Sequence, residues 1–265
     1  RIMNKYLMFF YLSLFILFLL QILPAHSGNI TITILYDNYV YTEGTRADWG
    51  FSCLIQGTEK TILFDTGTKP DILFHNIKKL QVNIQEVELI VLSHDHGDHT
   101  GGLFSLLKEN HRVSVYIPHV FSDAFFTGVK KHGADAIAVT QSRKICNNVY
   151  LTGQIGDQIP EQSIILDTDK GGVLITGCSH PGIVKIIEKS KRILGKKIHM
   201  VFGGFHLMGK SMPEMQKIIR QFKKLGVEKV GPTHCTGDKQ IEAFKKAYGK
   251  HFIRMGTGKI LSFSS

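Results

Sequence analysis

Runs of apolar residues along the chain predict strands in its first half. Residues 30–36 (ITITILY) alternate β-branched and apolar side chains, and residues 50–55 and 61–64 are two further apolar runs separated by a polar, glycine-containing turn. Because the runs are short and turn residues bound them, they predict three strands in an antiparallel meander. Residues 71–80 place apolar side chains at helical spacing, which predicts a helix with Asp71 as its N-cap.

The same rhythm of strands and helices continues to the C-terminus. Further helices are predicted over 101–109, 183–194, 213–225 and 241–248, and further strands over 87–92, 113–117, 172–176, 199–202, 229–230 and 260–263. Because strands are followed by helices in both halves, the pattern predicts an α/β fold with sheets covered by helices. No linker rich in proline, glycine and serine interrupts it, so we expect a single domain over residues 28–265.

The first residues have the pattern of a targeting segment. Two of the first five are basic, residues 6–23 carry no charge, and the small residues Ala25 and Ser27 follow. This pattern predicts a secretory signal over residues 1–27. An uncleaved signal anchor is the alternative, because the apolar run is long enough to cross a bilayer of about 30 Å. Either one predicts an exported chain, which is periplasmic, extracellular or anchored in the membrane and facing outward.

Composition narrows the classes of function. With 43% hydrophobic and 20% charged residues, the chain has the apolar content of a folded protein. The net charge of +10 suits a small anionic substrate, but no dense basic block with interleaved aromatics is present. We therefore expect no dedicated nucleic-acid binding, and membrane contact only through the N-terminal segment. Four scattered cysteines do not form a disulfide scaffold, although one bridge or a free thiol is compatible with them.

A cluster of histidines carries the candidate chemistry. The segment 93–103 (SHDHGDHTGGL) follows a predicted apolar strand and holds three histidines and two aspartates within six residues. Such side chains cost free energy when desolvated unless they are paired or bind a metal. In an extended segment His94 and His96 project to the same side and can share one ion, and Asp98 with His99 can face a second. Imidazole and carboxylate donors suit zinc, iron or manganese.

The spacing His94-x-His96-x-Asp98-His99 resembles the signature of the metallo-β-lactamase superfamily. The segments LYDN, WGFS, ILFDTG, LSHDHGDHTGGL, TGCSHPGI, GGFHL and GPTHCTG resemble its dihydropterin-related, synthase-like branch. This resemblance covers residues 30–263. It implies a four-layer αβ/βα sandwich, in which two mixed β-sheets are flanked by helices. It also implies two divalent metal ions, zinc first with iron or manganese as alternatives, and an Asp65 that braces the metal loop.

Further site residues follow from the resemblance. His234 matches the last metal histidine. The chain departs from the family pattern at the third ligand of the first ion, because no histidine occurs between His132 and His180; His180, directly after a predicted strand, is therefore the candidate for that ligand. Cys178 stands where a bridging aspartate is common; it is either a thiolate ligand or a small buried side chain, and we expect it near the ions but outside bonding distance. We expect His206 to contact substrate or transfer a proton rather than bind metal. His119 is a weaker candidate.

These observations predict a metal-dependent hydrolase of a small ester, phosphodiester, lactone or amide, including anionic ones. Asp98 would orient the attacking water, and His206 or Cys235 would donate a proton to the leaving group. A pterin-related synthase or transferase of the same fold is one alternative. A non-catalytic or redox member, whose metal site serves binding or electron transfer, is the other. The sequence leaves the oligomeric state open.

Overall fold

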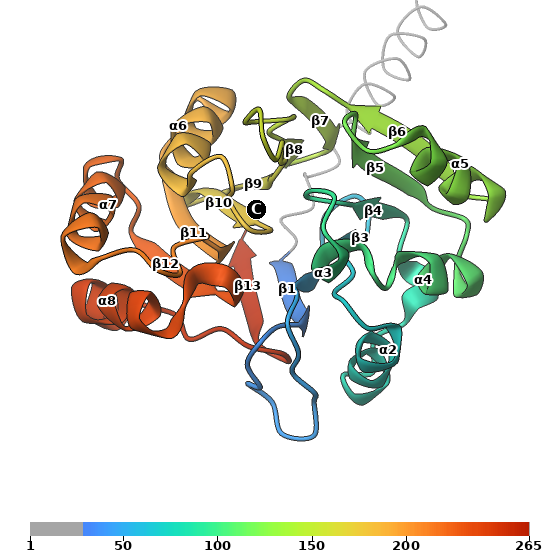
Figure 1. Cartoon of the computed structure of the whole chain (residues 1–265), viewed down its shortest axis with the longest axis horizontal. Helices are drawn as coiled ribbons and strands as arrows, with labels where there is room; N and C mark the ends of the chain where they lie inside the picture. Colours follow the sequence, from blue (N-terminus) through green and yellow to red (C-terminus); the bar gives the residue numbers. More distant parts are fainter. Residues whose placement is uncertain (1–28, 265) are drawn as a thin grey trace, which may run out of the picture.

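A computed structural model describes residues 29–264 of the chain (Figure 1). The expected targeting segment, residues 1–27, lies outside the described residues. Between residues 29 and 264, no helix is both long enough and apolar enough to cross a membrane. Cleavage and anchoring of the N-terminal segment therefore both stay predictions.

Two mixed β-sheets form the centre of the fold (Figure 1). The first sheet contains β1 (Asn29–Tyr36), β2 (Ser52–Gln56), β3 (Ile62–Phe64), β4 (Leu89–Val91), β5 (Ser114–Pro118), β6 (Asp135–Val139) and β13 (Ile260–Ser264). The second contains β7 (Arg143–Cys146), β8 (Val149–Leu151), β9 (Ile164–Thr168), β10 (Gly171–Thr176), β11 (Ile198–Gly204) and β12 (Lys229–Thr233). Their strand orders are β13-β1-β2-β3-β4-β5-β6 and β12-β11-β10-β9-β8-β7.

Helices cover the outer face of each sheet (Figure 1). The helical segments are α2 (Pro70–Lys79), α3 (Gly97–Thr100), α4 (Leu103–Glu109), α5 (Asp123–Lys131), α6 (Ile183–Leu194), α7 (Met212–Lys224), α8 (Asp238–Tyr248) and the short η1 (Ile84–Glu86), η2 (His234–Thr236) and η3 (Gly249–His251). One buried cluster joins α2, α4 and α5 to the first sheet, and another joins α6, α7 and α8 to the second. The layers are therefore helix, sheet, sheet, helix, which confirms the αβ/βα sandwich.

The space between the two sheets is filled by a third apolar cluster. Ile32 of β1 and Phe64 of β3 meet Ile175 of β10 and Phe202 of β11 there, all fully buried. Alternate residues of a strand point to opposite faces, so the alternation seen in residues 30–36 places one set of isoleucines in this shared core. Burial of each such side chain contributes about 1.5–3 kcal/mol to folding.

Most predicted elements are present, with three differences. β1, β2 and β3 pair antiparallel as predicted, and α6 has the predicted bounds. However, α2 begins at Pro70, so Asp71 lies in its first turn instead of capping it. The predicted helix over 101–109 corresponds to α4, which begins two residues later, and the short helix α3 directly before it was not predicted. The pattern also missed the helix α5, in which Val129 is the one buried residue. It missed β6 to β9 as well, because these strands are short and turns separate them.

The strand ends place the candidate residues. β10, β11 and β12 are parallel neighbours, so their carboxyl ends meet at one edge of the second sheet. In the first sheet, β4 runs parallel to β3 and β5 and leads into the histidine-rich segment. The segments that directly follow β4, β10, β11 and β12 carry every candidate metal ligand.

Candidate metal centre

Three imidazoles form the first ligand group. His94 and His96 follow β4, whereas His180 follows β10, so both sheets contribute. Their ligand atoms all lie within 4.8 Å of one another, and His94 Nε2 is 3.1 Å from His96 Nδ1. The ring centroids of His94 and His180 are 4.6 Å apart. The structure thus brings His180 next to the two motif histidines.

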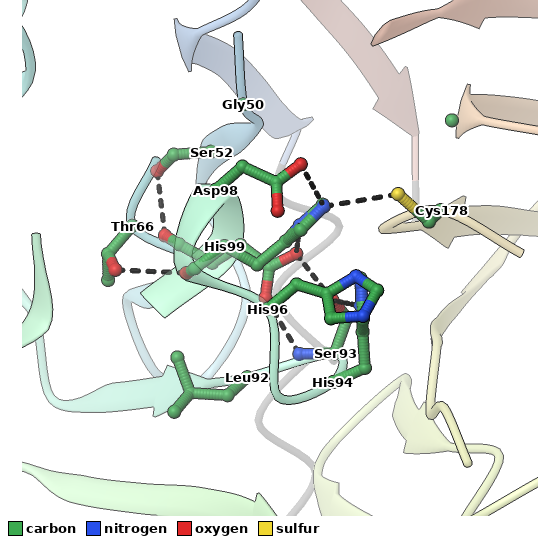
Figure 2. A network of polar contacts seen from close by, with 12 residues as sticks. Gly50, Ser52, Thr66, Leu92, Ser93, His94, His96, Asp98, His99 and Cys178 are labelled. Atoms are coloured by element: carbon green, nitrogen blue, oxygen red, sulfur yellow. Dashed lines mark hydrogen bonds and ion pairs between the residues drawn. The ribbon is translucent and has the colours of Figure 1, made fainter. Parts of the chain in front are cut away.

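The second group combines a carboxylate, two imidazoles and a thiol: Asp98, His99, Cys178 and His234. Asp98 Oδ2 lies 3.2 Å from His234 Nε2 and 3.6 Å from His99 Nε2. Cys178 Sγ lies 3.2 Å from His99 Nε2 and 3.3 Å from His234 Nε2. Figure 2 shows the Cys178 sulfur directed at the His99 ring. The sulfur is as close to the two histidines as the carboxylate is, so Cys178 lies beside the candidate ligands as expected, and its distance from an ion stays a prediction.

The two groups lie side by side. The ring centroids of His94, in the first group, and His99, in the second, are 4.3 Å apart. The donor set fits zinc-type cations, because imidazole and thiolate prefer such ions to magnesium or calcium. His94, His96 and His180 could hold one cation, and the four residues of the second group could hold another.

Asp65 orients one histidine in each group. Its Oδ2 accepts a hydrogen bond from His99 Nδ1 at 2.7 Å. The backbone N and the Oγ of Ser93 donate to Asp65 at 2.7 Å each, and the same Oγ is 2.9 Å from His94 Nδ1. Figure 2 labels Ser93, His94 and His99 of this network. Because Nδ1 of each ring is bonded outward, Nε2 of each faces the centre, which is how outer partners select the ligating nitrogen.

Burial sets the charge of the two central histidines. It lowers the pKa of both His94 and His99 to about 3, because a desolvated imidazolium is costly. Both rings are therefore neutral at neutral pH and have a lone pair free for a cation. Burial also raises the pKa of Asp65 to about 8, against the opposing effects of His94 and Ser93.

Glu161 holds the loop that carries Cys178 and His180. Its Oε1 accepts from the backbone N of Cys178 and of Ser179 at 2.8 Å each. Its Oε2 accepts from the backbone N of His180 at 3.0 Å and lies 3.2 Å from His180 Nδ1. The carboxylate is fully buried. Although burial raises its pKa, the interaction with His94 and these hydrogen bonds outweigh that effect and hold the pKa below its usual value.

No sequence pattern singled out Glu161. Its one signal is that an acidic residue stands three positions before an apolar strand, and this arrangement is common.

Asn38 was also not identified from the sequence. Its Oδ1 accepts from His234 Nδ1 at 3.0 Å, and its Nδ2 donates to the His234 carbonyl at 3.2 Å. The neighbouring Asp37 is fully buried and accepts from Thr233 Oγ1 at 2.7 and 2.8 Å. The LYDN segment therefore fixes the position of His234 through hydrogen bonds to its ring, its carbonyl and the neighbouring Thr233.

Backbone strain gathers at the same place. Asp65, Ser179, His206 and His234 have φ of 55°, 71°, 49° and 51°, a region that residues with a side chain rarely adopt. Such strain persists where the surroundings enforce it, and it concentrates at functional sites. Close packing also explains one glycine of GGFHL. A Cβ on Gly204 would lie 2.3 Å from the carbonyl oxygen of residue 177 and 2.8 Å from a cysteine sulfur.

The remaining candidates, His206 and His119, belong to neither of these two groups. His206 is exposed at the rim, with its ring centroid 4.3 Å from that of His180, and its ligand atom is grouped with Cys178 and Cys235 instead. Among the described residues, no ligand group includes His119, whose backbone N donates to the Val139 carbonyl. All four cysteines are free and buried.

Fold and site together define a class: an αβ/βα sandwich with two adjacent groups of side chains that could hold metal ions at one edge of its sheets. The chain belongs to the metallo-beta-lactamase superfamily, whose profile matches residues 50–194. A relative from Methanocaldococcus jannaschii, named 7,8-dihydropterin-6-methyl-4-(beta-D-ribofuranosyl)-aminobenzene-5'-phosphate synthase, is 31% identical, and the match covers 89% of this chain and 97% of that protein.

Solved structures agree with the fold. A metal-dependent hydrolase of the beta-lactamase superfamily is 28% identical, with a TM-score of 0.77, over 89% of this chain and 100% of that one. The metallo-beta-lactamase fold protein YhfI from Bacillus subtilis has a TM-score of 0.64 at 15% identity, over 88% of this chain and 99% of that one. At that identity the second match supports the fold alone.

Proposed function

We propose that the chain is a metal-dependent hydrolase of small esters, phosphodiesters, lactones or amides. The observation that carries the proposal is the contact between the two ligand groups, whose His94 and His99 rings are 4.3 Å apart. The 28% identical relative of known structure, described as a metal-dependent hydrolase, supports it. Divalent cations at such a centre supply an activated water and polarise the scissile carbonyl or phosphoryl oxygen.

Asp98 is suited to orient the attacking water. Its side chain is 16% exposed, whereas His99 and His234 beside it are 0% exposed, so the carboxylate lies between the buried ligands and the open edge. Burial raises its pKa, but the hydrogen bond from His234 and the interactions with the two neighbouring histidines outweigh that effect and lower it. Asp98 is therefore ionised at neutral pH and can accept a hydrogen bond from water.

The rim of the centre offers contacts for a substrate. Trp49 is 46% exposed, and its ring centroid lies 4.9 Å from that of His234. His206 is also exposed, whereas Cys235 is buried. We therefore assign the contact with the leaving group of the substrate to His206. The net charge of +10 favours anionic substrates.

A pterin-related synthase is the second candidate. The M. jannaschii relative with that name is 31% identical over 89% of this chain, which is a higher identity than the 28% of the hydrolase. The two candidates use the same centre and differ in the reaction that it supports.

One experiment separates them. Protein purified without added metal is analysed for bound ions and assayed on chromogenic phosphodiester, lactone and β-lactam substrates. We expect bound ions and hydrolysis of at least one substrate. His96→Ala should lose at least one ion per chain together with the hydrolysis, and the control His119→Ala should show no change. Bound ions without hydrolysis, together with formation of the product that names the relative, would favour the synthase.

We also propose that residues 1–27 direct export and that the mature chain begins at Gly28. N-terminal sequencing of protein from the native host tests this directly. A full-length chain found free in the cytoplasm would contradict both cleavage and anchoring.

A further inference from the structure

We propose a third cation position, formed by Cys178, His206 and Cys235. The ligand atoms of these three side chains lie within 4.8 Å of one another. None of the three comes from the histidine-rich segment after β4, and the set shares only Cys178 with the second ligand group. This position goes beyond the proposed hydrolysis, because it can exist whichever reaction the centre supports.

The topology of the second sheet creates the position. β10, β11 and β12 are adjacent and parallel, and they end at Thr176, Gly204 and Thr233. Each of the three donors stands two residues beyond the end of its strand: Cys178 after β10, His206 after β11 and Cys235 after β12. Since the carboxyl ends of parallel neighbours meet at one edge, equal spacing beyond those ends brings the three side chains together.

Local contacts hold the donors close. Cys178 and Cys235 are 3% and 4% exposed, and Cys235 Sγ donates to the Cys178 carbonyl at 3.5 Å. The missing side chain of Gly204 makes room for the Cys235 sulfur, because a Cβ there would lie 2.8 Å from it. His206 closes the set from the exposed side with a backbone φ of 49°. Among the described residues, Cys53 and Cys146 join no ligand group.

The donor types select the cation. Two thiols and one imidazole are a donor set found at catalytic zinc sites, where a fourth position is open. Thiolate donors prefer zinc, cobalt or cadmium to magnesium, calcium or manganese. The Cys178 thiolate would be shared with the second group, and the outer nitrogen of His206 would remain free for a substrate at the rim.

Cobalt titration of the metal-free full-length chain tests the proposal without a substrate. Bound Co²⁺ is counted by elemental analysis after gel filtration, and thiolate-to-cobalt charge-transfer absorption is recorded. We expect three ions per wild-type chain. Cys235→Ala should bind two ions with a weaker charge-transfer band, which persists because Cys178 remains. The control Cys146→Ala, which removes a buried cysteine outside every ligand group, should bind three ions with an unchanged band.

A second variant covers the case in which Cys235→Ala does not fold. His206→Ala changes an exposed side chain, keeps both thiols, and should lose the same ion. Far-ultraviolet circular dichroism checks that each variant is folded. Two ions per wild-type chain, or three that survive in both Cys235→Ala and His206→Ala, would overturn the third position.

Discussion

The carboxylate of Glu161 contacts His180 at two points, with Oε2 3.0 Å from the backbone N and 3.2 Å from the ring Nδ1. Through Oε1 it also accepts from the backbone N of Cys178. A single buried side chain thus positions one candidate ligand in the first group and one in the second. Because the loop after β10 has no regular structure of its own, these hydrogen bonds define where its ligands lie.

Replacing Glu161 should therefore affect both folding and cation binding. Glu161→Ala leaves three buried backbone N–H groups without their acceptor, and each such group costs about 1–3 kcal/mol. We expect the free energy of unfolding of the metal-free chain, measured in urea, to fall by roughly 3 kcal/mol or more. Glu161→Gln keeps one oxygen and should mainly weaken cation affinity, by about 10–100-fold in a chelator competition.

The matched control for Glu161 is Glu228→Gln, which changes an exposed carboxylate paired with Lys197. An exposed pair contributes about 0–1 kcal/mol, so this variant should behave like the wild type. Unfolding of Glu161→Ala at the same urea concentration as the control would show that the loop does not depend on the carboxylate.

Replacing Asp65 and replacing Asn38 should weaken cation binding at different numbers of positions. Asp65 bonds His99 directly and His94 through Ser93, so it reaches both ligand groups. Among the candidate ligands, Asn38 forms hydrogen bonds only with His234, which belongs to the second group. We expect Asp65→Asn to weaken binding of both cations by about 10–100-fold each, and Asn38→Ala to weaken only one.

A stepwise zinc titration against a chromogenic chelator measures both affinities in one experiment. Asp167→Asn is the control for Asp65→Asn, because Asp167 pairs with Lys196 far from the centre. If Asp65→Asn weakened one step and left the other at its wild-type value, the link from Asp65 to His94 through Ser93 would have no effect on binding.

Sequence patterns predicted the parts of the fold that depend on local periodicity. α6 has an apolar stripe at helical spacing and a glycine directly after its last residue, so both bounds were predictable. In β1, alternation predicted which side chains face the core. The bend of the histidine segment into α3 was not predictable, because its geometry depends on contacts such as the hydrogen bond from Thr66 N to the His99 carbonyl.

The candidate site could be predicted to a similar extent. His94, His96, Asp98 and His99 lie within six residues of sequence, so one segment specifies their proximity. The position of Cys178 depends instead on how the loop after β10 packs against β11 and on the bonds from Glu161. Such contacts between distant segments have no local signature, and this is why the sequence left open whether Cys178 is a ligand or a small buried side chain.

Trp49 gives a prediction about substrate binding. Its exposed ring lies over the rim next to His234, and aromatic contacts contribute about 0.5–1.5 kcal/mol. On the best substrate of the hydrolysis panel, Trp49→Ala should therefore raise KM roughly 3- to 10-fold and leave kcat nearly unchanged. Trp49→Phe should restore most of the affinity. An equal fall of kcat and kcat/KM would show instead that Trp49 acts in the transition state.

Titration of Asp37 should make the free energy of unfolding depend on pH. Burial raises its pKa from 3.8 to about 7, although the hydrogen bond from Thr233 and the charge of His234 oppose the shift. Between these two values the folded chain keeps a proton that the unfolded chain has released. The stabilisation is complete below the unfolded pKa, is lost as the pH rises toward the folded pKa, and amounts to roughly 4 kcal/mol for a shift of this size.

Urea unfolding of the metal-free wild type and of Asp37→Asn at several pH values isolates this effect. Asparagine cannot titrate, and other buried groups such as Asp65 are common to both chains, so the difference between the two unfolding free energies reports Asp37. We expect the wild type to lose stability relative to Asp37→Asn as the pH rises from about 4.5 to about 8. A difference that stays constant over that range, within about 0.5 kcal/mol, would mean that Asp37 titrates alike in the folded and unfolded chains.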